Sequence, residues 1–282
     1  MLVRLWNGKL EKWDTEEVTV PGKPGIGPSD KYLKVRDSFI EPDENGNFVS
    51  STYTDEELDA VHAFATARLT IDLWEKALGK KIQWPWRKSS DNRLKIHLYY
   101  ELVDAVFRND EQAIIFGTTG NPLKYTCKSF DIVSHETTHA IIESLFPSIH
   151  DEFGKLRFTL IESVADLSPI MLLTSIPKFL NKAMDDTQND LLQTNFISEF
   201  GEGYSFKGNE IRNALFPDSK PEGHHQKSSI ITNFIYLWLV ASINSTNNYN
   251  TSAALKHNSY VIRNFLDAIK NNTKDKILQL FI

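Results

Sequence analysis

The sequence predicts an α+β protein with two lobes: a strand-rich N-terminal lobe, residues 1–146, and a helical C-terminal lobe, residues 147–282. Two observations predict this fold class. Short apolar segments separated by turn dipeptides such as Asn7-Gly8 and Pro21-Gly22 fill the first 50 residues. By contrast, segments with apolar residues at helical intervals dominate the second half. The first lobe ends in the helix that carries the strongest motif of the chain.

Composition limits the possible partners. The chain has 282 residues, of which 41% are hydrophobic, and a formal net charge of −6 without any run of Lys or Arg. We therefore expect no nucleic-acid or membrane partner and a monomeric protein. The single cysteine, Cys127, excludes an internal disulfide and is expected to pack as a small hydrophobe. Without a Sec signal in this chain, the expected location is cytoplasmic by default, or secreted if a leader was removed.

The first long helix has a clear start and stop. Thr54 and Glu57 have the spacing of a capping box, and apolar residues recur at helical intervals until Gly79. His62 and Arg68 lie on this helix. For them we favour a packed histidine and a surface arginine over a role in a site.

Strands are expected at residues 95–100 and 113–117, where apolar residues alternate or cluster. Residues 104–107, between them, fit an edge strand, whose free backbone groups can pair with an extended peptide. A plain surface hairpin explains this pattern equally well. Further helices are predicted from Ser129 to before Pro147, from Phe158, at 188–198, from the loop at 223–229 to Ser242, at 259–270 and at 274–281.

The chemistry is concentrated in residues 131–142, which contain the motif His-Glu-x-x-His. His135 and His139 are four residues apart, so on a helix both imidazoles face one metal ion. Glu136 lies beside them and can take a proton from a water that the metal acidifies. The alternative is an ordinary buried helix that contains the pattern by chance.

The next predicted helix supplies two acids among apolar neighbours. Glu162 and Asp166 are four residues apart and are flanked by Leu, Ile, Val and Ala. A buried carboxylate needs a cation or a metal beside it. Glu162 is therefore the natural third ligand, and Asp166 can accept a hydrogen bond from the free ring nitrogen of a ligand histidine.

Together, His135, His139, Glu162 and Asp166 resemble the gluzincins, and specifically the thermolysin family of metallopeptidases, which has His-Glu-x-x-His on one helix and Glu-x-x-x-Asp on the next. The resemblance implies a thermolysin-like two-lobe fold and one catalytic Zn²⁺. Thermolysin binds zinc through two histidines and a glutamate. That the metal here is zinc is therefore implied by the family resemblance.

A second segment, residues 225–237, resembles the family segment that opens with a histidine and leads into a helix. The resemblance implies that His225 hydrogen-bonds the oxyanion of the tetrahedral intermediate. The family has an orienting Asp five positions earlier, where this chain has Lys220, so Asp218 or Glu222 would have to replace it. The family tyrosine that also holds the oxyanion has no clear counterpart.

The resemblance also implies residues that bind substrate. Asp104 and Ala105 occupy the place of the family's Asn-Ala on the strand that pairs with the peptide, and Arg212 that of the arginine that binds a substrate carbonyl. Ile132 and Ile211 fall where the family lines its first primed pocket. The chain is therefore expected to prefer an apolar residue after the cleaved bond.

Calcium is not expected at the family's double site. Asp131 matches one calcium ligand, but Leu173 stands where another carboxylate is needed.

The predicted function is a zinc-dependent endopeptidase that acts on peptides or proteins. The alternative is a catalytically weak or inactive protein of the same fold that binds a peptide or partner. Lys220 and the missing tyrosine favour this alternative, whereas the presence of Glu136 argues against it. A third interpretation, a metallohydrolase with another kind of substrate, requires a pocket closed to an extended chain.

Overall fold

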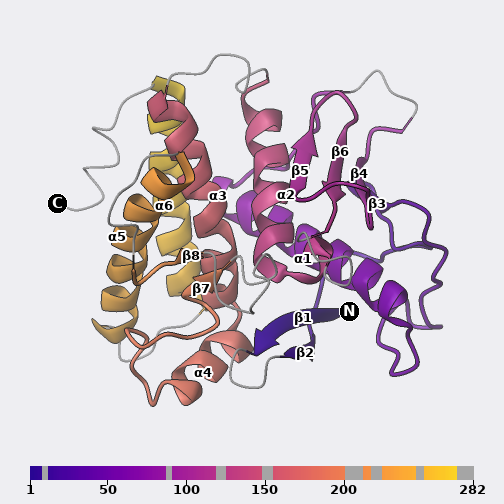
Figure 1. The fold of residues 1–282 in the computed structure, drawn as a ribbon, viewed down its shortest axis with the longest axis horizontal. Helices are drawn as coiled ribbons and strands as arrows, with labels where there is room; N and C mark the ends of the chain where they lie inside the picture. The colour runs from indigo at the N-terminus through magenta and orange to yellow at the C-terminus, as the bar shows by residue number, and fades with distance from the viewer. Residues whose placement is uncertain are drawn as a thin grey trace.

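The computed structural model describes residues 1–7, 12–86, 91–118, 125–147, 155–200, 212–216, 224–245 and 251–271. The main sheet lies on one side of the molecule and the C-terminal helices on the other, with helix α2 (Phe130–Leu145) between them (Figure 1). Strands in the N-terminal region and helices in the C-terminal region confirm the predicted α+β, thermolysin-like fold class.

The main sheet has four short strands in the order β3 (Leu33–Val35), β4 (Leu94–His97), β6 (Ala113–Phe116) and β5 (Ala105–Arg108). The first three are parallel, and β5 pairs antiparallel with β6 at one edge. The edge strand expected at 104–107 is therefore confirmed, and it packs against α2. This contact brings the outer side of β5 to the predicted metal helix.

Gly117, which follows β6, is required by a close approach of the backbone. A Cβ placed there would lie 2.0 Å from the carbonyl oxygen of Leu102, in the loop that leads into β5. Only glycine leaves room for this loop. The glycine therefore helps to fix where the edge strand begins.

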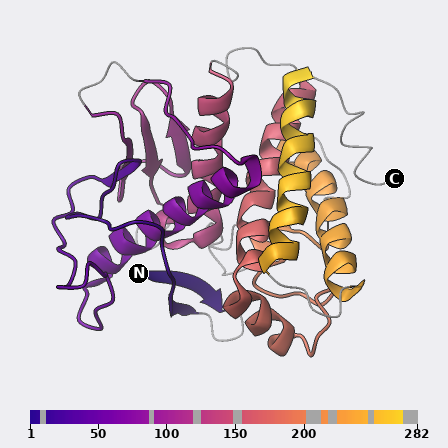
Figure 2. The same ribbon diagram turned by 180° about the vertical axis from the view of Figure 1, so that it is seen from behind.

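Helix α1 (Asp55–Leu78) begins and ends as predicted. Thr54 and Glu57 form the capping box, and Gly79 ends the helix in a left-handed conformation with φ 68°. The helix crosses the back of the molecule diagonally, from the sheet toward α6 (Thr251–Asn271) (Figure 2). It thus packs against both the strand side and the helical side.

The two polar residues singled out on α1 have different outcomes. His62 is a packed histidine, as expected: its side chain is buried and its Nδ1 accepts a hydrogen bond from the backbone N–H of Arg4 at 2.8 Å. The prediction of a surface position for Arg68 is wrong. This residue is 4% exposed, and its Nε lies 3.1 Å from a carboxylate oxygen of Asp30 while its guanidinium stacks over Tyr32. The segment that contains these two partners covers this part of α1.

The N-terminal region forms one hairpin, of β1 (Leu2–Asn7) and β2 (Lys12–Glu17), before β3. The other turn-rich residues described before α1 make bends and isolated bridges, so fewer strands form than the turn dipeptides suggested. A 3-10 turn, η1 (Thr126–Lys128), leads into α2 and buries Cys127, which packs as predicted.

In the second half, α3 (Lys155–Ser175) packs against α2, and α5 (His224–Ser245) and α6 pack against α3. Helix α6 begins at Thr251, earlier than predicted, and residues 274–281 lie outside the described part of the chain. Strands β7 (Glu199–Phe200) and β8 (Arg212–Asn213) form a two-residue pair.

The helix predicted at 188–198 does not form. Instead, α4 (Pro177–Asp186) starts with proline in its first turn and ends before Gln188 and Asn189, which have φ of 53° and 67°. Two successive left-handed residues stop a helix and cannot begin one. Residues 190–198 continue as turns.

Among the described residues, no single helix has the length and apolar composition to cross a membrane, although α3 and α4 together meet these criteria as a pair bent by 91°.

Candidate active site

Helix α2 presents the two histidines of the motif on one face. Its N-cap is Ser129 and it ends at Leu145, before Pro147, as the sequence predicts. His135 and His139 lie one turn apart, with their Nε2 atoms 3.0 Å from each other. Both rings are largely buried, so few waters compete for these nitrogens.

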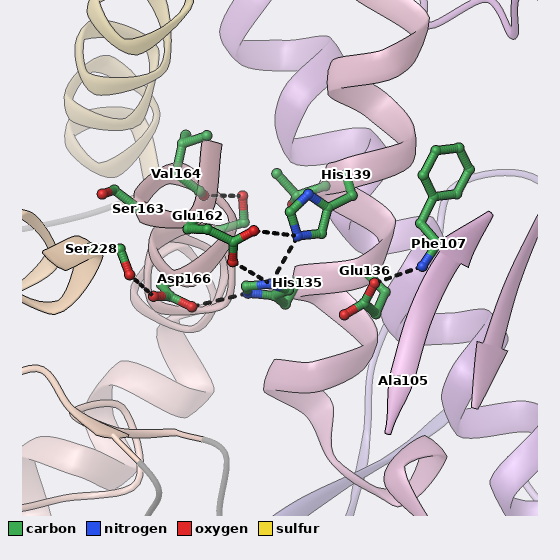
Figure 3. A network of polar contacts seen from close by, with 12 residues as sticks. Ala105, Phe107, His135, Glu136, His139, Glu162, Ser163, Val164, Asp166 and Ser228 are labelled. Atoms are coloured by element: carbon green, nitrogen blue, oxygen red, sulfur yellow. Dashed lines mark hydrogen bonds and ion pairs between the residues drawn. The ribbon is translucent and has the colours of Figure 1, made fainter. Parts of the chain in front are cut away.

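Helix α3 brings Glu162 to the same point (Figure 3). One carboxylate oxygen of Glu162 lies 3.4 Å from Nε2 of His135, and the other lies 3.6 Å from Nε2 of His139. Glu162 is 2% exposed, which a carboxylate tolerates only next to cationic or metal partners. The structure thus joins the three residues that the sequence suggested as ligands.

These donors fit a metal ion. Zinc ligands at about 2.0–2.1 Å in tetrahedral geometry lie about 3.3 Å from one another. The Nε2–Nε2 distance of 3.0 Å and the distances of 3.4 and 3.6 Å from these nitrogens to the two oxygens of Glu162 bracket that value. Two imidazoles and a carboxylate are also a ligand set that zinc uses in catalytic sites.

Asp166 contacts the other nitrogen of His135. Its Oδ1 lies 3.0 Å from Nδ1 of His135, and its Oδ2 accepts a hydrogen bond from Oγ of Ser228 at 3.1 Å. Burial lowers the pKa of His135, but the hydrogen bonds and charges of Asp166 and Glu162 outweigh burial and raise it to about 10. Because only the neutral imidazole binds a metal, a metal ion and a proton compete for His135.

Glu136 lies on the other side of the histidines, toward the sheet. Its Oε2 accepts a hydrogen bond from the backbone N–H of Phe107 on β5 at 2.8 Å (Figure 3). Burial raises the pKa of Glu136 to about 7, His135 opposes the shift, and Glu162 adds to it. Donor atoms of His135, Glu136 and His139 lie within 4.8 Å of one another, so Glu136 is a possible ligand by distance. Glu162, the ligand that the sequence predicts, lies close to both Nε2 atoms, whereas Glu136 is held by β5.

Two of the predicted substrate-binding residues stand at the start of β5. Asp104 is exposed, and its backbone N–H and C=O pair with Thr118 and Gly117 next to β6. Its Oδ1 accepts a hydrogen bond from the N–H of Ala105 at 2.8 Å. Because backbone groups alternate along a strand, the amides of Ala105 and Phe107 point away from β6 and toward the site.

The other predicted residues are placed less completely. Ile132 lies on α2, one turn before Glu136, and is 5% exposed. The backbones of His225 and Arg212 belong to the first turn of α5 and to β8, but their side chains lie outside the described structure. Ile211 lies outside it altogether, as do Asp218, Lys220 and Glu222. Their roles stay predictions.

Asp131, which matches a calcium ligand of the family, lies in the first turn of α2 and accepts a hydrogen bond from Ser129. Leu173, on α3, is buried in the hydrophobic core of the protein.

Two contacts of this site have no clear signal in the sequence. Ser228 belongs to the segment that follows His225, and its hydrogen bond to Asp166 links residues 62 positions apart. The N–H of Phe107 is a backbone group, so no side-chain pattern marks it. A polar residue at the start of an apolar helix is the one signal that could have pointed to Ser228.

Two histidines on one helix, a carboxylate on the next and a buried glutamate against an edge strand define a gluzincin-type metallopeptidase site. Residues 31–143 match the family model of the thermolysin metallopeptidase catalytic domain, and this match includes α2 with His135, Glu136 and His139. The matched part of the chain is therefore similar to the catalytic domain of the thermolysin metallopeptidases. No curated protein matches it.

Proposed function

We propose that this chain is a zinc-dependent endopeptidase with His135, His139 and Glu162 as the ligands of one catalytic Zn²⁺. The observation that carries the proposal is the convergence of His135, His139 and Glu162. The Nε2 atoms of the two histidines lie 3.0 Å apart, and the two carboxylate oxygens of Glu162 lie 3.4 and 3.6 Å from these nitrogens. Three protein ligands leave one position of a tetrahedral ion open, which is the arrangement of catalytic rather than structural zinc.

Zinc in such a site acidifies a water and polarises the carbonyl that the water attacks. Glu136 supplies the proton transfer. Its carboxylate takes the proton of the attacking water and delivers it to the leaving amine. The N–H of Phe107 holds one of its oxygens at 2.8 Å, which leaves the other oxygen for the proton.

The substrate lies along β5 in this proposal. The strand is an edge of the sheet, and an extended peptide adds to such an edge through main-chain hydrogen bonds. Ala105 carries the outward amide closest to the start of the strand, and this amide donates to the Asp104 carboxylate. A substrate carbonyl would take the place of that carboxylate.

Two finer features complete the proposal. We infer a preference for an apolar residue after the cleaved bond, supported by Ile132 on the face of α2 that carries the motif. His225 is assigned to stabilise the oxyanion, supported by its place in the first turn of α5, the helix that contacts Asp166. Loss of one oxyanion donor typically costs about 3 kcal/mol in the barrier.

Incubation of the zinc-loaded protein with a mixed peptide library, followed by mass spectrometry of the products, tests the proposal. We expect cuts before apolar residues, and no cuts by the Glu136→Gln variant at equal zinc content. If the wild type binds peptides but makes no cuts, the alternative of a peptide-binding protein without turnover is correct. Cleavage by Glu136→Gln at the wild-type rate would remove Glu136 from the mechanism.

A further inference from the structure

Ser228 connects helix α5 to the metal ligands. Its hydroxyl is the donor to Oδ2 of Asp166 at 3.1 Å, and Oδ1 of the same carboxylate lies 3.0 Å from Nδ1 of His135 (Figure 3). Ser228 and Asp166 are at most 1% exposed. The three residues come from three helices, α5, α3 and α2, so this chain of contacts crosses both helix interfaces at the site.

We propose that Ser228 is a positioning residue of the metal centre, which acts through Asp166 on His135. This inference rests on the proposed zinc site. As a carboxylate, Asp166 can only accept hydrogen bonds, so the Ser228 hydrogen points at Oδ2 and fixes the rotation of the carboxylate plane. Oδ1 then stays on Nδ1 of His135.

The consequence for His135 concerns its tautomer. An imidazole that donates Nδ1–H to Asp166 carries its lone pair on Nε2. Nε2 of His135 is the atom that lies 3.0 Å from Nε2 of His139 and 3.4 Å from Oε2 of Glu162. The Ser228 hydroxyl therefore helps to keep the neutral ligand form of His135 aimed at the metal.

A second buried hydroxyl near the site has a different arrangement. Ser163 is next to Glu162 on α3 and is also fully buried, but its hydroxyl donates to the carbonyl of Thr159 in its own helix at 2.7 Å. Such a bond to the preceding turn is ordinary for serine in a helix. Ser163 is thus a matched control, because it has the same residue type and burial and is adjacent to a ligand, while its hydroxyl donates within its own helix.

The position of Ser228 also ties two parts of the site together. Ser228 lies three residues after His225, so both residues belong to the first turns of α5 and to the same face of this helix. A hydrogen bond from this part of α5 to the metal-side carboxylate fixes the helix start relative to His135. Any group that α5 contributes to the reaction is then held in register with the metal.

The test is the Zn²⁺ affinity of purified variants, measured by competition with a chromophoric chelator. We expect Ser228→Ala to bind Zn²⁺ about tenfold more weakly and Ser163→Ala to remain within about twofold of the wild type. Asp166→Ala should lose about 10- to 100-fold. Adding Ser228→Ala to Asp166→Ala should then change nothing, because the hydroxyl acts through the carboxylate.

Equal Zn²⁺ affinity of the Ser228→Ala and Ser163→Ala variants would overturn the proposal, and so would additive losses in the double variant. Should Ser228→Ala not fold, Ser228→Gly provides the same test, since it also lacks the hydroxyl and adds no metal ligand. A normal Zn²⁺ affinity in Ser228→Gly also contradicts the proposal. Because peptide cleavage is not part of this measurement, a failure of the proposed peptidase function is separately visible.

Discussion

The backbone N–H of Phe107 donates a hydrogen bond of 2.8 Å to Oε2 of Glu136, so the edge strand β5 and the helix α2 meet at the proposed base. The bond has two effects. It fixes the glutamate between the sheet and the histidines, and it uses a backbone donor that points away from β6. The strand that is proposed to bind the peptide therefore also orients the group that transfers the proton.

This contact predicts that the length of the Glu136 side chain matters as much as its charge. Glu136→Asp shortens it by one methylene, so the carboxylate cannot reach both Phe107 and the reacting water. We expect about a hundredfold loss of kcat, because a displacement of about 1 Å has costs of this size. Steady-state kinetics on a fluorogenic peptide measures the loss. Zinc content should equal that of the wild type, and a variant with wild-type kcat would contradict the geometry.

Removing the third ligand should empty the metal site. Glu162 places its two carboxylate oxygens 3.4 Å from Nε2 of His135 and 3.6 Å from Nε2 of His139. In Glu162→Ala we expect Zn²⁺ affinity to fall by more than about 100-fold, since even outer contacts of a metal site cost 10- to 100-fold. Metal analysis after gel filtration measures this loss. Glu143→Gln is the control and should keep its zinc, because Glu143 is also buried but accepts a hydrogen bond from Asn109. Stoichiometric zinc in Glu162→Ala would refute the assignment of Glu162 as a ligand.

Local patterns were sufficient for the elements that position the metal. The capping box at Thr54, the helix from Ser129 and the acids of α3 all depend on residues within a few positions of one another. The spacing of His135 and His139 fixes their relative placement on any helix. For that reason the donors could be identified without knowledge of the fold.

Contacts between distant residues could not be predicted in this way. Arg68 is buried because Asp30, 38 positions earlier, supplies a partner, and no local pattern contains that pairing. The bond from Ser228 to Asp166 has the same character. The incorrect prediction of a helix at 188–198 had a local cause. Gln188 and Asn189 adopt left-handed conformations, which prevent a helix despite the apolar residues that follow.

His62 predicts an acid-sensitive term in stability. Burial lowers its pKa to about 3, and the charges of Arg4 and Lys128 act in the same direction. Near pH 6.5 the unfolded chain takes up a proton that the folded chain does not bind. His62 therefore permits full stability above about pH 6.5 and costs stability as the pH falls toward 3.

Replacement of His62 by Gln should remove this term. Below about pH 6, the slope of the unfolding free energy against pH should decrease by up to about 1.4 kcal/mol per pH unit relative to the wild type. Urea unfolding of both metal-free proteins at several pH values measures the difference, in which the titration of the metal site cancels. Parallel curves for the two proteins would show that His62 does not contribute.

The buried pair of Arg68 and Asp30 should contribute far more to stability than an exposed pair on the same helix. Arg68 is 4% exposed and its Nε lies 3.1 Å from Asp30, whereas Lys76 and Asp72 lie 2.6 Å apart with the lysine side chain 59% exposed. Arg68→Ala removes a buried guanidinium that contacts both Asp30 and the buried Glu75, and breaking such a buried pair costs about 3–5 kcal/mol. Water screens the exposed pair, which is worth about 0.3–0.5 kcal/mol. Denaturant unfolding of Arg68→Ala and Lys76→Ala measures both losses. Equal losses would mean that the segment around Asp30 does not close over α1 in solution, and the burial of Arg68 would then have to be abandoned.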